Sequence, residues 1–116
     1  MESFDHEKLD VYQKSIEFLI LADHVSEDLP RGRSYLAEQL RRAALSICLN
    51  IAEGAGEFNK SEKKRFYRIA RRSATECAAI FDACKALKLM ETQILSPGRT
   101  LLFRIVSMLV KMAKPS

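Results

Sequence analysis

Gln39 to Gly56 reads QLRRAALSICLNIAEGAG, and this stretch organises the rest of the chain. Its apolar residues recur at steps of three and four, a spacing that places side chains on one face of a helix. The row begins at Leu36, just before this stretch, and continues with Leu40, Ala43, Ile47 and Ile51. Ser34 is a suitable N-cap for this helix. Gly54 and Gly56 predict its end, because glycine adopts the left-handed conformation of a C-terminal cap.

A row of polar residues follows the same spacing on an adjacent face of this helix: Gln39, Arg42, Ser46, Asn50 and Glu53. Two interpretations fit the row. It is either a face in contact with solvent or a hydrogen-bonded network between helices or subunits. Ser and Asn are mediocre residues in a helix interior, which favours a packing role. Ser73 and Glu76, further along the chain, are the candidate partners in such a network.

Residues 5–28 predict the first helix, which carries two apolar stripes. One contains Leu9, Tyr12, Ile16, Leu19 and Ile20, and the other contains Val11, Phe18, Leu21 and Val25. A helix that is apolar over such a wide arc needs two neighbours, for example its own bundle and a partner chain. Pro30 and Gly32 then predict a break.

Two more helices follow. Asn59 begins a capping motif, and the residues after it step by three and four through a predicted seam: Phe66, Ile69, Ser73, Cys77, Ile80, Cys84 and Leu87. Ser96-Pro97 predicts the start of the last helix. Four amphipathic helices joined by short connections predict an all-α fold, an antiparallel up-and-down four-helix bundle, over a single domain of residues 1–116.

The stretch QLRRAALSICLNIAEGAG, followed by KSEKKRFYRIARRSATE, resembles the signature of the 23S rRNA-intervening sequence protein family, also called the four-helix-bundle protein family. The opening FDHEKLDVYQKSIEF and the pair Leu29–Pro30 also match the family's pattern, so the resemblance covers most of the chain. It implies a four-helix bundle that assembles into a homo-oligomeric ring, commonly a pentamer. It also implies RNA as the partner inferred for members of the family.

Composition narrows the class of protein. The chain has 116 residues and three cysteines, Cys48, Cys77 and Cys84, with no CxxC pair, so we interpret all three as core residues rather than disulfide or zinc ligands. No apolar run reaches the roughly 20 residues of a membrane span. The polar, acidic N-terminus is not typical of a secretory signal, so we expect a cytoplasmic protein with no membrane partner.

Charge is distributed unevenly along the chain. Residues 1–28 carry two basic and eight acidic side chains, whereas residues 29–72 carry eleven basic and four acidic ones. Lys60, Lys64, Arg68 and Arg71 step by four and three on the helix face opposite the predicted seam, with Arg41 and Arg42 as secondary candidates. Cations near a helix N-terminus are disfavoured by the helix dipole, so their presence indicates a role.

Three interpretations of this basic stripe remain open. The cations bind the phosphates of RNA or DNA, with Phe58 and Tyr67 placed to stack on an unpaired base. Alternatively they pair with the acidic first helix of the same or a neighbouring subunit, or they form a solvated face. The rival to a nucleic-acid-binding protein is therefore a structural or adaptor protein whose ring contacts other proteins.

Catalysis has little support in the sequence. A di-iron bundle needs Glu-x-x-His pairs, but Ser3 stands three positions before His6, and Leu21 stands three before His24. No convincing Ser–His–Asp arrangement can be assembled. We therefore expect no enzyme, no cofactor and no metal.

Overall fold

Four α-helices make up most of the computed structural model, which describes residues 2–115. Two short 3₁₀ turns, Asp5–Lys8 and Arg31–Arg33, precede the first and second helices. The helices are α1 (Asp10–Asp28), α2 (Ser34–Ala55), α3 (Lys60–Ala86) and α4 (Thr92–Met112). Residues 2–115 contain no strand, so the predicted all-α class is confirmed.

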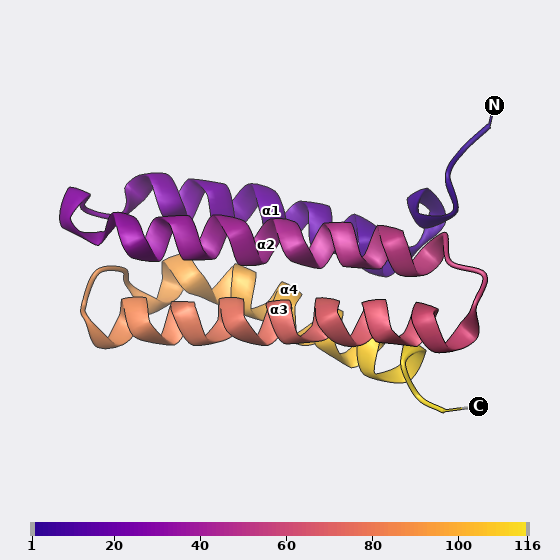
Figure 1. Ribbon diagram of the computed structural model, residues 1–116. Helices are drawn as coiled ribbons and strands as arrows, with labels where there is room; N and C mark the ends of the chain where they lie inside the picture. The colour runs from indigo at the N-terminus through magenta and orange to yellow at the C-terminus, as the bar shows by residue number, and fades with distance from the viewer. Residues whose placement is uncertain (1, 116) are drawn as a thin grey trace.

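The helices form an antiparallel, up-and-down square. In Figure 1, α1 and α2 make one layer, and α3 and α4 make the other. Each helix packs against its two neighbours in the order α1–α2–α3–α4 and back to α1. The edge formed by α1 and α2 therefore lies opposite the edge formed by α3 and α4. None of the helices among the described residues is long and apolar enough to cross a bilayer.

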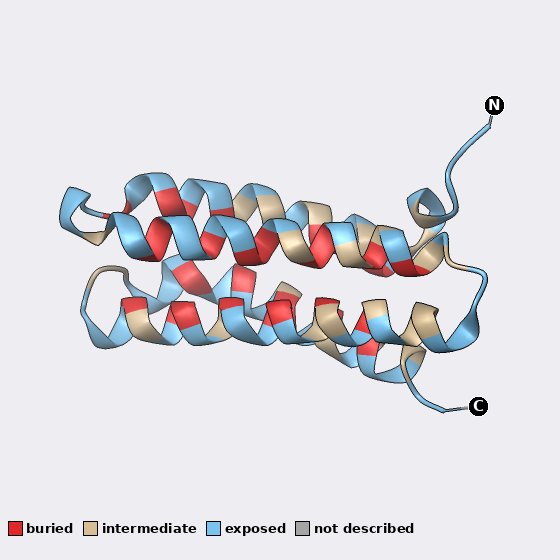
Figure 2. Ribbon diagram, viewed as in Figure 1, coloured by how far each residue is buried: buried red, intermediate tan, exposed pale blue. Residues whose placement is uncertain are grey.

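The core runs along the inner faces of all four helices (Figure 2). The rings of Phe18 in α1 and Phe81 in α3 meet across it, with their centroids 5.8 Å apart. Leu, Ile and Ala side chains supply most of the remainder. Cys48, Cys77 and Cys84 are all buried and free, as the sequence analysis predicts.

The predicted start of the first helix and the predicted cap of the second are wrong, although the second helix does begin at Ser34. The first helix does not run continuously from Asp5, because Leu9 is extended (φ −78°, ψ 127°) and separates the 3₁₀ turn from α1. The carbonyl of Leu9 accepts bonds from the amides of Tyr12 and Gln13, which fixes the start of α1 at Asp10. Ser34 is not an N-cap either. It is already helical, because the turn at Arg31–Arg33 leads directly into α2, and its hydroxyl makes no capping bond.

The last helix begins earlier than predicted. Its N-cap is Glu91, so Pro97 lies inside α4 rather than at its first position. The helix tolerates Pro97 because the φ angle of proline fits a helix and only one amide donor is lost. The additional turn before Pro97 buries Leu95. Gly98 is needed for packing. A Cβ there would lie 2.7 Å from both Leu21 and Phe81, so glycine allows α4 to approach α1 and α3 closely.

The predicted seam of α3 is correct in its middle and wrong at its ends. Ser73, Cys77, Ile80 and Cys84 are buried, whereas Phe66 and Ile69 are half-buried and Leu87 is exposed. Near its N-terminus, α3 instead buries Tyr67 and Ala70. The Asn59 cap is present, and its Oδ1 accepts from the amide of Glu62 at 2.9 Å.

The glycines that end α2 have a different role from the predicted left-handed cap. Gly56 has φ −86°, and none of the glycines described has positive φ. Gly54 is buried, and a Cβ there would lie 2.6 Å from Cε1 of Tyr67. The end of α2 is capped by Lys63 of α3, whose Nζ donates to the carbonyls of Gly54 (2.7 Å) and Ala55 (3.0 Å). The two glycines are therefore not equivalent.

We expect Gly54→Ala to destabilise the protein, because the new methyl group collides with the Tyr67 ring. Overpacking costs about 1–3 kcal/mol, which exceeds the gain of about 1 kcal/mol from replacing glycine in a helix. Gly56→Ala is the matched control, since its Cβ meets nothing closer than 3.7 Å. Urea unfolding of both variants checks this, and equal stabilities would contradict the proposed close approach.

We expect Ile80→Asp to unfold the protein. The Ile80 side chain is only 7% exposed, and an unpaired buried charge costs several kcal/mol, about 3–5 by analogy with broken buried pairs. Ala79→Asp on the neighbouring exposed position is the control and should fold normally. Far-UV circular dichroism distinguishes the two variants, and a folded Ile80→Asp protein would show that the α3 core is misassigned.

Candidate nucleic-acid interface

The cations at the start of α3 divide into two groups, and the first group has structural partners. Lys63 caps α2, as described above, and its Nζ lies 5.9 Å from the centroid of the Tyr67 ring. Arg65 pairs with Glu62 at 2.7 Å, and its guanidinium lies 4.7 Å from the centroid of the Phe66 ring. These contacts explain why a helix N-terminus tolerates part of its positive charge.

The second group is the basic stripe itself, Lys60, Lys64, Arg68 and Arg71. Lys60 and Arg68 are exposed and Arg71 is half-exposed; none of these three forms an ion pair with a described residue. Lys64 is half-buried and makes an interaction within the chain. Lys60 and Arg71 are eleven positions apart, so a rise of 1.5 Å per residue gives the stripe a length of about 16 Å. Positive charge is thus held along one line of α3.

The stripe runs along the side of α3 that borders α4. Lys64, Arg71 and Ala78 are spaced by seven residues, so they lie nearly in line along the helix. Ala78 lines a shallow hollow together with Phe103 and Val106 of α4. The stripe therefore continues towards the α3–α4 edge and away from α2.

The two aromatic residues predicted to stack on bases have opposite environments. Phe58, in the loop between α2 and α3, is 98% exposed and lies two residues before Lys60. Tyr67 is buried against Gly54, so the prediction that it contacts a base is wrong. Burial also raises the pKa of the Tyr67 hydroxyl. Phe58 is the aromatic side chain available beside the stripe.

The structure does not bring Arg41 to the stripe. Its Nε lies 3.3 Å from Oδ1 of Asp23 in α1, so it faces the α1–α2 edge and pairs with the acidic first helix of its own chain. Arg42 is exposed on α2 and forms no ion pair with any residue from 2 to 115. It lies in the row that contains Gln39 and Ser46, which faces α3.

Two residues of the polar row on α2, Gln39 and Ser46, form hydrogen bonds to α3, and Asn50 bonds to Ser46 within α2. Nε2 of Gln39 donates to Oε2 of Glu76 at 2.5 Å, and the Ser73 hydroxyl donates to that of Ser46 at 2.9 Å. Nδ2 of Asn50 donates to the Ser46 hydroxyl (3.0 Å) and carbonyl (2.9 Å). Ser73 is buried, Ser46 and Asn50 are half-buried, and Gln39, Glu76 and Glu53 are exposed.

The buried nucleophiles are held in their unreactive forms. Burial raises the pKa of the Cys77 thiol to about 12, with smaller contributions from Glu76 and Cys48. Burial also raises the pKa values of Cys48 and Cys84. A neutral, enclosed thiol is a poor nucleophile and a poor metal ligand. Within residues 2–115, no group of three or more His, Cys, Asp or Glu side chains is arranged to hold a metal ion.

Comparison with known proteins agrees with the bundle geometry. The family model described as 23S rRNA-intervening sequence protein matches residues 7–111. The chain belongs to the 23S rRNA-intervening sequence protein family. The match includes all of α1, α2 and α3, the basic stripe, and nearly all of α4. No curated protein matches the chain. The family resemblance seen in the sequence is therefore confirmed.

We expect Asn50→Ala to lower the free energy of unfolding by about 1 kcal/mol, the usual contribution of one hydrogen bond. The variant loses both bonds to Ser46, whose hydroxyl is then held by Ser73 alone. Glu53→Ala, one turn further along the exposed end of the row, is the control and should change stability by less than about 0.5 kcal/mol. Thermal and urea unfolding measure both. Equal values would mean that the row contributes no stability at Asn50.

Proposed function

We propose that this member of the 23S rRNA-intervening sequence protein family binds single-stranded RNA along its basic stripe and acts as a homo-oligomer, with five copies as the resemblance implies. The observation that carries the proposal is the division of the α3 cations. Lys63 and Arg65 have structural partners, while Lys60, Arg68 and Arg71 lie outward without ion pairs to described residues.

The dimensions of the stripe suit a nucleic-acid backbone. Its length of about 16 Å corresponds to about four or five stacked nucleotides at roughly 3.4 Å each. Residues 60–72 contain seven basic side chains and one acidic one, so the field over this surface attracts phosphates. Arginine can hold a phosphate through two parallel hydrogen bonds, which Arg68 and Arg71 would provide.

The exposed Phe58 ring favours single-stranded RNA over a duplex. An aromatic ring stacks on an unpaired base, whereas bases within a duplex already stack on one another. The family description itself refers to 23S rRNA, which favours RNA over DNA as the partner. We place this binding in the cytoplasm.

Self-association would strengthen this binding. One stripe contacts only a few phosphates, and several copies on one RNA raise the overall affinity without any new kind of contact. Large apolar side chains exposed on the chain, including Ile20, Leu49 and Phe103, support association with other copies. We propose binding rather than catalysis as the activity of this assembly.

The test is a fluorescence titration of a single-stranded RNA oligonucleotide against the protein at several salt concentrations. The logarithm of affinity should fall with the logarithm of salt by roughly 0.7 per phosphate neutralised. Lys60→Gln with Arg68→Gln should weaken binding and reduce this slope by about 1.4, because two phosphate contacts are lost. The variants should remain folded, since both side chains are exposed.

Arg31→Gln with Lys85→Gln is the matched control. It removes the same charge from exposed positions at the opposite end of the bundle, so the salt slope should be unchanged (Figure 1). Equal binding by both double variants would contradict the proposed site. A loss of assembly in Lys60→Gln with Arg68→Gln, measured by mass photometry, would assign the stripe to subunit pairing instead.

A further inference from the structure

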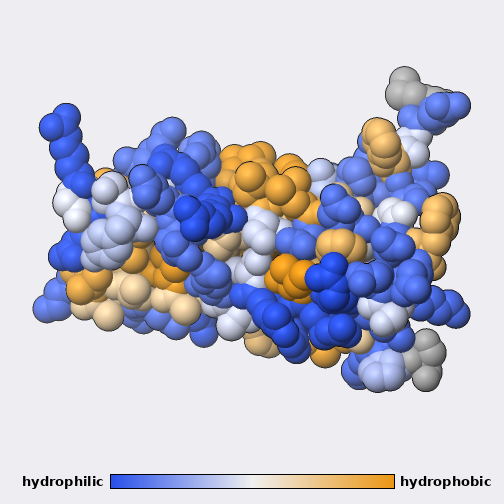
Figure 3. All heavy atoms as spheres, in the orientation of Figure 1, coloured by the Kyte–Doolittle hydropathy of each residue, from blue (hydrophilic) through white to orange (hydrophobic). Residues whose placement is uncertain are grey.

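Two apolar surfaces lie on opposite edges of the bundle. The α1–α2 face is formed by Tyr12, Ile16, Leu19, Ile20, Leu45 and Leu49, and the α3–α4 face is formed by Ala78, Phe103, Val106 and Val110. Ile20 is 56% exposed, Leu49 is 54% and Phe103 is 76%, although each belongs to a helix that buries its opposite side in the core. Figure 3 shows apolar side chains gathered over the middle of the α1–α2 layer.

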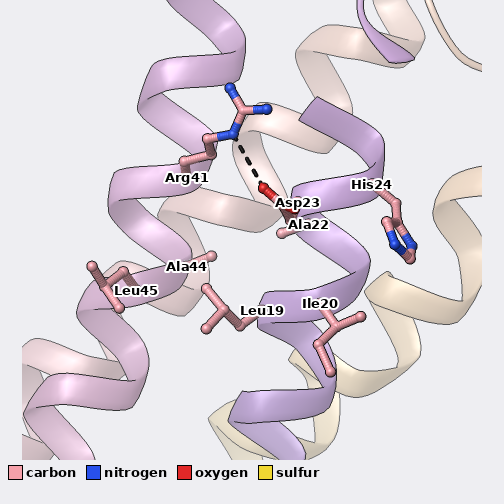
Figure 4. Close-up of a pocket in the computed structure, with 8 residues that line it drawn as sticks. All are labelled: Leu19, Ile20, Ala22, Asp23, His24, Arg41, Ala44 and Leu45. Carbon is pink, nitrogen blue, oxygen red and sulfur yellow. Dashed lines mark hydrogen bonds and ion pairs between the residues drawn. The ribbon is translucent and has the colours of Figure 1, made fainter. Parts of the chain in front are cut away.

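The α1–α2 face is hollowed into a groove of about 420 Å³. Figure 4 shows Leu19 pointing into the space between the two helices, with Ile20 on the far side of α1 and Leu45 on the far side of α2. Ala22 and Ala44 contribute small side chains, which leave room above the core. The ion pair between Asp23 and Arg41 joins the two helices at one end of the groove. The groove has enough volume to receive an aromatic side chain.

The α3–α4 face carries a projecting apolar row beside the shallow hollow that Ala78 lines. Phe103, Val106 and Val110 follow one another at steps of three and four, so they form a ridge along α4. Phe103 is the most exposed of the three and projects beside the small side chains of Ala74 and Ala78. One copy therefore carries both a groove and a ridge, on edges that lie opposite each other.

The charges beside these faces are also complementary. Asp23 borders the groove, and Glu27 and Glu38 lie one turn further along the same edges, so three carboxylates accompany the single guanidinium of Arg41. The ridge helix α4 contains Arg99, Arg104 and Lys111 and no acidic residue, although Arg99 contacts Asp82 of α3. The edge around the groove therefore has excess negative charge and the ridge helix has excess positive charge, which favours contact between the two different faces over contact between like faces.

We propose that the α1–α2 groove of one copy receives the Phe103 ridge of the next copy. Because the two faces differ and lie on opposite edges, this contact is heterologous and passes from copy to copy in one direction. Repetition of such a contact closes into a ring or extends into a filament. The inference rests on the self-association in the proposed function and is independent of RNA binding.

The test uses one blocking variant for each face, Ile20→Asp for the groove and Phe103→Asp for the ridge. Both side chains are more than half exposed, so the variants should fold. Ile94→Asp, which changes an equally exposed aliphatic residue of α4 outside both faces, is the control. Masses of the wild-type protein, each variant and an equimolar mixture of the two blocking variants are measured by native mass spectrometry.

We expect the wild-type protein and Ile94→Asp to assemble, and each blocking variant alone to be a monomer. The mixture should form a complex of two chains, because Phe103→Asp keeps an intact groove and Ile20→Asp keeps an intact ridge. A monomeric wild-type protein, assembly by either blocking variant alone, or a mixture that stays monomeric would overturn the proposal. If either aspartate variant is unfolded by circular dichroism, Ile20→Ser and Phe103→Ser replace the pair under the same criteria.

RNA titration of the monomeric variants separates this inference from the proposed function. If the Ile20→Asp monomer binds RNA with an unchanged salt slope, the proposal that the basic stripe binds RNA is supported, whatever the assembly result. If the wild-type protein assembles as described but does not bind RNA, the proposed activity is overturned and the groove-and-ridge contact still stands.

Discussion

The close packing of α2 on α3 is the contact on which the rest of the structure depends. Gly54 has no side chain, so the Tyr67 ring lies directly against the end of α2, and Lys63 binds the last carbonyls of that helix. Further along, hydrogen bonds join Ser46 to Ser73 and Gln39 to Glu76. Together these contacts set the rotation of α3 about its own axis. That rotation determines which of its many cations reach solvent.

The rotation of α3 also separates the cations that bind groups within the bundle from the cations that remain exposed. Lys63 lies on the side that faces α2 and satisfies backbone carbonyls, which offsets part of the cost of a cation at a helix N-terminus. Lys60 and Arg68 lie on a different side and remain exposed. The same helix therefore holds the bundle together with one row of side chains and leaves a second row of cations exposed to solvent. Arg41, on α2, is used within the bundle because α1 supplies Asp23.

Small residues recur wherever the helices approach most closely. Gly54 admits Tyr67, Gly98 admits Leu21 and Phe81, and Ala70 and Ala74 of α3 are fully buried. Because these small residues let the helices pack closely, the interior has little room for more large side chains, and Ile20, Leu49 and Phe103 lie outside it. A bundle of this composition fills its core with apolar side chains and still exposes apolar surface on two opposite edges. That distribution is typical of a chain that associates with other chains.

The sequence alone determined the four helices, their antiparallel order and the family, because apolar spacing near 3.6 residues and short connections leave few other folds. It also located the basic stripe and named Ser73 as a partner of the polar row on α2, with Ser46 and Asn50 as the alternatives, and the structure shows the bond to Ser46. Only the tertiary structure decided the role of Gly54, the burial of Tyr67 and the separate uses of Lys63 and Lys60. These depend on where a neighbouring helix lies to within an ångström, and periodicity along one helix carries no information about that distance.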